Sequence, residues 1–101
     1  MKRLALLLAL ALSVAAASSA AAQCYADYKA TRDPPREKPV ELHYGVIALP
    51  AELCNDPDGA EQEIRRRIRR DGWRLLVVDG MFGPEGLGAR REDAGEYYLR
   101  Y

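Results

Sequence analysis

Arginine is concentrated in one short segment of the chain. Five of the six positions over 65–70 carry it, and Ile68 is the exception. A guanidinium group offers a rigid fork of N–H donors that matches carboxylate and phosphate oxygens. The segment therefore predicts a surface for an anionic partner, either an unknown protein or an anionic component of the cell envelope. The candidate binding residues are Arg65, Arg66, Arg69 and Arg70.

A solvated helix face is the second interpretation of the same segment. Glu61 and Glu63 precede Arg65 and Arg67 by four positions, the order that favours ion pairs along a helix. Positive charges near the last turn also interact favourably with the helix dipole. Both interpretations stay open on the sequence alone.

Glycine marks a second segment of interest, over 80–95, which holds five glycines. Glycine-rich backbone followed by Arg90 and Arg91 suggests a phosphate cradle, but the Gly-Lys-Ser/Thr of a P-loop is absent. We expect a mobile hairpin loop, with contact to a partner as the alternative. The residues expected to make that contact are Phe82, Leu87, Arg90 and Arg91.

The sequence offers few groups for catalysis. Serine occurs only at Ser13, Ser18 and Ser19, and His43 is the single histidine. A serine–histidine nucleophile or a site with several histidine ligands therefore cannot be assembled after the first 22 residues. A carboxylate pair around the glycine segment is the acid–base arrangement left open. We expect no enzymatic activity, no metal and no cofactor.

The N-terminal residues have the pattern of a secretory signal. A basic start precedes an apolar run to Leu12, and residues 20–22 fit the small-residue cleavage site. We expect residues 1–22 to be a signal peptide and the mature chain to begin at Gln23, in the periplasm or outside a Gram-negative cell. The apolar run is shorter than the roughly 20 residues of a transmembrane helix, so no span is expected in the mature form.

The two cysteines, Cys24 and Cys54, predict one disulfide. An oxidising compartment favours the bond, and a chain this short benefits from a covalent link. Closing a loop of about 30 residues stabilises a protein by roughly 3–4 kcal/mol. The alternative is that Cys24, directly behind the leader, carries a lipid, although Gln23 occupies the place where lipid attachment prefers a small residue.

Charge and length exclude further classes. The 15 Lys and Arg balance 15 Asp and Glu, and the isoelectric point is about 6.6. Domains that bind nucleic acid are usually basic overall, so no nucleic-acid partner is expected. A chain of 101 residues has room for one domain.

The elements that position these residues follow from the periodicity of the apolar residues. Alternation predicts a strand over 41–49. Apolar residues at every fourth position predict a helix over 60–70, which ends at Gly72. Two further strands are expected over 73–78 and 96–101.

Three segments result: the signal peptide over 1–22, an extended N-terminal segment and linker over 23–40, and a domain over 41–101. The domain is a small α+β fold of order β-α-β-β, with one helix on a three-stranded sheet in two layers, stapled by the disulfide. A right-handed crossover makes the first two strands parallel. The last strand is expected between them and antiparallel to both.

One face of this sheet is apolar without an evident cover. Alternation from Trp73 places Leu75 and Val77 toward the helix and Leu76 and Val78 on the opposite face. Such a face must be covered by something, either the N-terminal segment or a second copy of the chain. The covering groups expected from the N-terminal segment are Tyr25 and Tyr28.

Several stretches carry a resemblance. DGWRLLVV, directly after an amphipathic helix, and the closing EYYLRY resemble a family of small uncharacterised bacterial domains with a helix, a Gly-Trp-x-Leu strand and a closing Tyr-x-Leu-(Lys/Arg) strand. CYADYKA, LHYGV, FGPEGL and AGEYYLRY are similar to stretches of short secreted proteins of Gram-negative bacteria. The resemblance implies the β-α-β-β fold and implies no activity.

Taken together, these observations predict a small secreted protein that acts as a binding or protein-interaction module. The alternative is a structural or accessory protein that forms a homodimer through its open sheet face.

Overall fold

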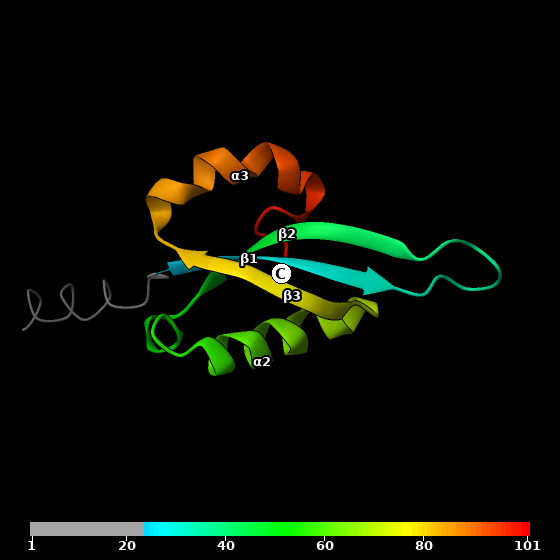
Figure 1. The fold of residues 1–101 in the computed structure, drawn as a ribbon, viewed down its shortest axis with the longest axis horizontal. Helices are drawn as coiled ribbons and strands as arrows, with labels where there is room; N and C mark the ends of the chain where they lie inside the picture. The colour runs from blue at the N-terminus through cyan, green and yellow to red at the C-terminus, as the bar shows by residue number, and fades with distance from the viewer. Residues whose placement is uncertain (1–23) are drawn as a thin grey trace, which may run out of the picture.

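The computed structural model describes residues 24–101, which form a three-stranded sheet with two helices packed against it (Figure 1). The signal peptide expected over 1–22, together with Gln23, lies outside the described residues. The main elements in chain order are β1 (Cys24–Arg32), β2 (Glu41–Leu49), α2 (Pro57–Ile68), β3 (Arg74–Phe82) and α3 (Leu87–Ala94). The α+β class and the three-stranded sheet are therefore as predicted.

The central strand of the sheet is β1. The strand order is β2-β1-β3, and β1 is antiparallel to both neighbours. A strand between two parallel strands was the predicted topology, but the prediction that 96–101 forms that strand is wrong. The order β-α-β-β is corrected to β-β-α-β-α, because the chain enters the sheet at Cys24 instead of Glu41.

The N-terminal strand escapes sequence inspection because its inward positions are small. Ala26 and Ala30 flank Tyr28 on the face turned to the core, and all three are 0% exposed. Alanine is depleted in strands, so the alternation gives a weak signal. The Tyr28 ring crosses β2 at Gly45, where a Cβ would lie 2.6 Å from the ring. Only glycine leaves room for this crossing.

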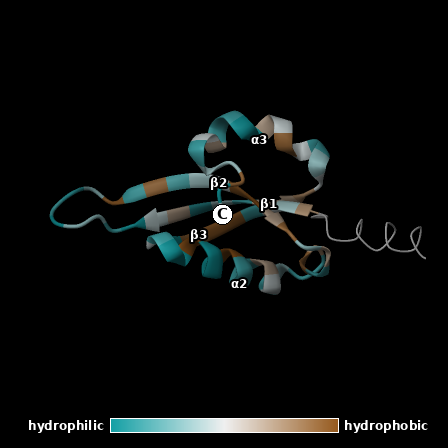
Figure 2. Ribbon diagram, turned by 180° about the vertical axis from the view of Figure 1, so that it is seen from behind, coloured by the Kyte–Doolittle hydropathy of each residue, from teal (hydrophilic) through white to brown (hydrophobic). Residues whose placement is uncertain are grey.

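Helix α2 covers the core face of the sheet. Its buried side chains are Ala60, Ile64 and Ile68, spaced as predicted. The helix begins earlier than expected, at Pro57, because the side chain of Asp56 accepts a hydrogen bond from the Gly59 amide at 3.0 Å. The predicted stop at Gly72 is confirmed by its left-handed φ of 82°. Figure 2 shows much of α2 as hydrophilic, with hydrophobic residues gathered on β3.

Two irregularities in β3 change which of its side chains reach the core. The register with β1 shifts between Asp27 and Tyr28 and again between Lys29 and Ala30. The expected alternation holds at Leu75, which is 7% exposed, but fails beyond Leu76: Val78 packs against the core, while Val77 is 46% exposed.

The glycine segment is ordered structure and not a hairpin loop. Residues up to Phe82 extend β3, a short 3₁₀ turn spans Pro84–Gly86, and α3 follows. The expected third strand over 96–101 is also absent from this part of the chain, where Gly95–Tyr97 form a 3₁₀ turn. The closing residues contribute one parallel bridge, from Tyr98 to Val46 on β2.

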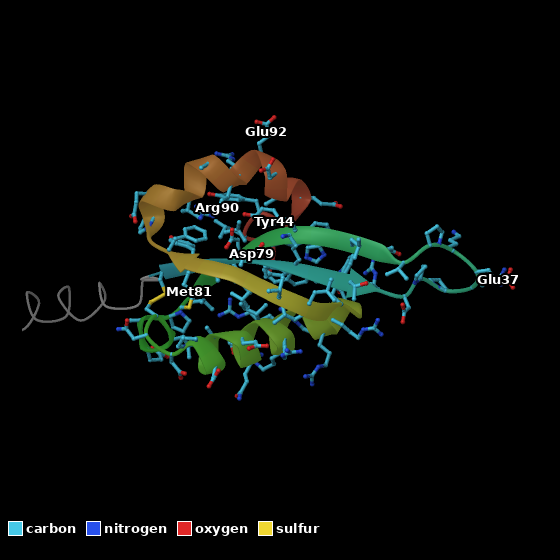
Figure 3. All side chains as sticks on the ribbon, in the orientation of Figure 1. Glu37, Tyr44, Asp79, Met81, Arg90 and Glu92 are labelled. Carbon is cyan, nitrogen blue, oxygen red and sulfur yellow. A yellow bond between two sulfur atoms is a disulfide. The ribbon has the colours of Figure 1, made fainter. Side chains whose placement is uncertain are left out.

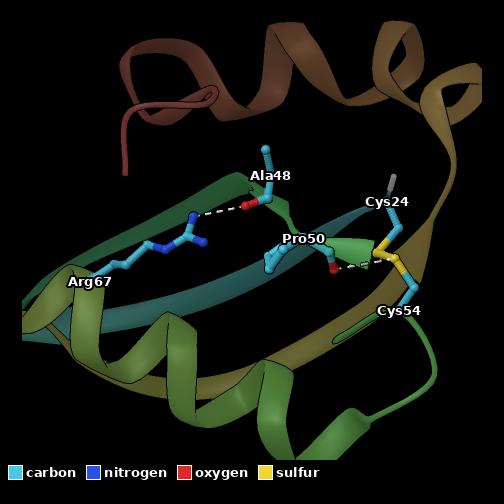
Figure 4. The surroundings of a disulfide bond; sticks show 5 residues. All are labelled: Cys24, Ala48, Pro50, Cys54 and Arg67. Atoms are coloured by element: carbon cyan, nitrogen blue, oxygen red, sulfur yellow. Dashed lines mark hydrogen bonds between the residues drawn. A yellow bond between two sulfur atoms is a disulfide. The ribbon is translucent and has the colours of Figure 1, made fainter. Parts of the chain in front are cut away.

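The predicted disulfide is confirmed and ties the start of β1 to the segment before α2. Cys24 and Cys54 are bonded, with their Cα atoms 5.9 Å apart (Figure 4). The same view shows Arg67 of α2 donating a hydrogen bond of 2.8 Å to the Ala48 carbonyl. The Cys24 sulfur is used by the disulfide, so it is not available for the lipid considered above.

Candidate anion-binding groove

The arginines of α2 divide between the two flanks of the helix. Arg67 reaches the β2 flank, where it also contacts Glu63 at 2.7 Å. Glu63 accepts a second ion pair from Arg66, also at 2.7 Å, and hydrogen bonds from these two arginines lower the Glu63 pKa. This cluster matches the solvated-face interpretation, because its charges are already satisfied within the helix.

A cavity lies on the other flank, between the end of α2 and the start of β3. It has a volume of about 320 Å³ and is lined by Arg65 of α2, by Arg69 of the 3₁₀ turn Arg69–Asp71 that follows α2, and by Arg74 of β3. Its remaining walls are formed by Thr31, Trp73, Leu75 and Leu76. The cavity therefore combines three guanidinium groups with apolar walls, and we name it the arginine groove.

The charges of the arginine groove are only loosely engaged. Arg65 pairs with Glu61 at 2.6 Å and Arg74 with Asp33 at 3.0 Å, but all four side chains are more than 40% exposed. Exposed pairs of this kind contribute about 0–1 kcal/mol, so a ligand can displace them at little cost. Within residues 24–101, Arg69 has no ion-pair partner.

The groove contains two of the four predicted arginines. Arg66 is paired with Glu63, and neither Arg66 nor Arg70 lines the cavity. Arg74 was not predicted, because it lies beyond the helix in the next strand. The signal that points to it is its position two residues after Gly72, where the chain turns back beside the helix end.

Two of the four predicted contact residues around the glycine segment, Phe82 and Arg90, hold α3 on the sheet. The Arg90 guanidinium lies 3.9 Å from the centre of the Phe82 ring, which stacks on Tyr25 at 6.2 Å. Leu87 is half-buried at the start of α3, and Arg91 lies exposed beside it on the surface of the helix. These four residues are not brought together with the arginine groove.

A buried carboxylate completes this attachment. Asp27 of β1 accepts a hydrogen bond of 2.8 Å from the Tyr44 hydroxyl and pairs with Arg90 at 3.0 Å. Figure 3 shows Tyr44 and Arg90 between the sheet and α3, whereas Glu92 points away from the sheet. Burial and the hydrogen bond to Asp27 raise the pKa of Tyr44 to about 12. Thus α3, and not Tyr25 and Tyr28, covers the second face of the sheet at this end.

Replacing Asp27 tests this attachment. We expect Asp27→Ala to lower the free energy of unfolding by about 2 kcal/mol, because two hydrogen bonds to a charged group are lost. Amide exchange in α3 should accelerate more than exchange in α2. Glu92→Ala, on the outer side of α3, is the control and should change stability by less than about 0.5 kcal/mol. Equal effects of the two substitutions would contradict this role for Asp27.

A second buried polar group lies on the core side of the sheet. His43 is 8% exposed and stacks on Tyr97 with ring centres 3.7 Å apart. Its Nε2 lies 2.9 Å from the Tyr28 hydroxyl, and the Trp73 ring meets it edge-on at 4.2 Å. Burial, and after it the nearby Arg32 and Arg100, lower the pKa of His43 to about 4. We therefore assign His43 to the aromatic core, in its neutral form.

The flank that carries the arginine groove continues toward the start of α2 as a second cavity. Its volume is about 490 Å³, and its walls include Asp58 and Glu61 of α2 and Val78 and Met81 of β3. Leu76 lines both cavities. The flank is therefore positively charged at one end and negatively charged at the other.

Within residues 24–101, no cluster of three or more His, Cys, Asp or Glu side chains could hold a metal ion. The same residues contain no helix that is long and apolar enough to cross a membrane. The chain matches no family model, and comparisons with curated proteins and with solved structures give no match.

Proposed function

We propose that the protein is a binding module without enzymatic activity and that it holds an anionic group of its partner in the arginine groove. The observation that carries the proposal is the convergence of Arg65, Arg69 and Arg74 on one cavity of about 320 Å³. Within residues 24–101 Arg69 has no ion-pair partner, and the exposed pairs of Arg65 and Arg74 leave their guanidinium groups accessible to a bound anion. Their planar donor groups fit a carboxylate or a phosphate.

The walls of the groove add selectivity. Trp73 and Leu75, which are 4% and 7% exposed, form apolar walls of the groove. Leu76, which is 57% exposed, offers apolar contact at the rim. A partner that presents an anion next to an apolar group gains from both surfaces, whereas a hydrated inorganic ion gains from the charge alone.

We further propose that the protein acts in the periplasm or outside the cell, after removal of residues 1–22. The Cys24–Cys54 disulfide supports this location, because such bonds persist in oxidising compartments.

The groove is tested by titration calorimetry with tripolyphosphate as an anionic probe, at about 0.15 M salt. Arg65→Gln/Arg69→Gln should weaken binding at least tenfold, because two of the three converging charges are lost. The matched control is Arg66→Gln/Arg70→Gln, which removes the same charge from the same segment, 65–70, but outside the groove, and should weaken binding less than threefold. Equal weakening by both pairs would show a diffuse charge effect and refute the proposal.

A homodimer formed through the sheet is the second candidate function. The half of the outer face that α3 leaves open carries Leu42, which is 70% exposed, beside a cavity of about 260 Å³ that Leu76 also lines. An apolar surface of this kind is typical of an interaction site.

Light scattering distinguishes this second candidate. If the protein dimerises, its measured mass should rise with concentration between about 10 µM and 1 mM. The Leu42→Glu variant should keep the mass of a monomer over the same range. Leu99→Glu is the control, since Leu99 is 40% exposed at the C-terminal end of the chain. A constant monomeric mass of the unmodified protein would exclude the dimer.

A further inference from the structure

The two edge strands of the sheet, β2 and β3, differ in how far other parts of the chain cover their outer backbone groups. At the β2 edge, the Leu99 amide donates a hydrogen bond of 2.9 Å to the Val46 carbonyl, and Arg67 donates to the Ala48 carbonyl. At the other edge, β3 pairs with β1 alone. Within residues 24–101, no other hydrogen bond to the backbone of β3 closes its outer edge. An edge strand of this kind presents N–H and C=O groups that can pair with another chain.

The free edge of β3 borders the flank that carries both cavities. Helix α2 lies beside β3 along this flank (Figure 1). The arginine groove lies at the start of β3, and the acidic cavity with Asp58 and Glu61 lies toward its end. The edge, the helix and the two cavities therefore form one channel with opposite charges at its ends.

We propose that this channel binds an extended peptide segment of a partner protein as an added fourth strand, antiparallel to β3. This inference rests on the function proposed above and identifies the anionic group as a carboxylate near the C-terminal end of the peptide. Strand addition between an edge strand and a helix combines main-chain hydrogen bonds with side-chain pockets. Antiparallel pairing places the C-terminal end of the peptide beside the N-terminal end of β3, where the arginines converge.

Charge complementarity sets the order of residues in the peptide. A carboxylate contacts Arg65, Arg69 and Arg74 at one end of the channel, and a lysine or arginine contacts Asp58 at the other, beyond Glu61, which pairs with Arg65 at 2.6 Å. Between them, the exposed Leu76 and Val77 favour β-branched or aliphatic side chains. The nine residues of β3 give room for a segment of about six to eight residues.

The irregularities of β3 set a limit on the pairing. The register shifts place Leu76 and Asp79 out of step with β1, and such features disrupt a regular ladder. We therefore expect the strongest pairing at Val77 and Val78, between the two irregular positions, and looser contact beyond Asp79. Because the main-chain pairing covers only a short stretch, we expect the charges at the two ends of the channel to determine the direction in which the peptide binds.

The test uses a synthetic octapeptide with lysine near its N-terminus, alternating threonine and valine in the middle, and glutamate at its C-terminus. Binding is measured by fluorescence anisotropy against a peptide in which the lysine and glutamate are exchanged. We expect the exchanged peptide to bind at least tenfold more weakly. Methylation of alternate backbone nitrogens should have a similar effect, because it removes the donors that pair with β3.

Two further readouts locate the peptide. Bound peptide should slow amide exchange in β3, with the largest change at Val77 and Val78, and leave exchange in β2 unchanged. Asp58→Asn should weaken the lysine-containing peptide several-fold, whereas Glu52→Gln, outside the channel, should not. Amidation of the peptide C-terminus distinguishes the two sources of the carboxylate: lost binding identifies the terminal group, and retained binding identifies the glutamate side chain.

The outcomes separate this inference from the function on which it rests. If tripolyphosphate still distinguishes the groove variant from its control while N-methylation or exchange of the peptide charges has no effect, strand addition is wrong and the anion site stands. If tripolyphosphate does not distinguish the variants, the anion site itself is wrong. Failure of every peptide to bind also overturns strand addition.

Discussion

Cys24→Ala/Cys54→Ala is expected to lower the free energy of unfolding by roughly 3–4 kcal/mol. The two cysteines are 30 positions apart, and opening a loop of this length increases the entropy of the unfolded chain by that amount. Because the disulfide also fixes the start of the central strand, we expect its removal to destabilise the whole sheet. Domains of this size have only about 5–15 kcal/mol of stability, so the variant should be close to unfolding at 37 °C.

Urea unfolding of the oxidised and reduced protein measures this effect. A reducing agent should lower the midpoint of the unmodified protein to nearly that of the double variant and leave the variant unchanged. If the double variant loses less than about 1 kcal/mol, the disulfide does not have the stabilising role described here.

Acidification from pH 6.5 to pH 4 should destabilise the protein by up to about 3 kcal/mol through His43 alone. The folded protein holds the pKa of His43 at about 4, below its ordinary value of 6.5, so the unfolded chain takes up the proton first. The stability that comes from the neutral imidazole is therefore complete above pH 6.5 and declines as the pH falls toward 4. Protonation would place a cation against Arg32 and Arg100 inside an aromatic cluster.

His43→Phe isolates this contribution, because it keeps an aromatic ring against Tyr97 and Trp73 but cannot be protonated. We expect the variant to be less stable at pH 7, where the contact to the Tyr28 hydroxyl is lost, yet to depend much less on pH between 6.5 and 4. Parallel stability curves for the two proteins over this range would contradict the assignment of His43 to the neutral form.

Much of the fold could be predicted from local patterns, and the errors have physical causes. The helix with Ala60, Ile64 and Ile68 inward has a strong period and clear ends. The alanines of β1 give no such signal, so the central strand was missed although its topological place was predicted. In β3 the two register shifts, which depend on pairing with β1, overrode simple alternation.

The candidate site was predictable only in part. The cluster over 65–70 identifies α2 as the cationic element, but the division of its arginines between two flanks depends on which side packs against β2 and which against β3. Arg67 contacts the Ala48 carbonyl across a sequence separation of 19 residues, a contact that no local pattern reveals. The contribution of Arg74 likewise depends on how the strand returns beside the helix.

The arginine groove is tested most directly by nuclear magnetic resonance of the arginine Nε–H groups during titration with tripolyphosphate. We predict that the resonances of Arg65, Arg69 and Arg74 shift together and saturate with one binding constant, while those of Arg66 and Arg70 stay within about a tenth of that change. Parallel, unsaturated shifts of all five arginines would show that the anion is attracted by overall charge, and would contradict a groove formed by these three residues.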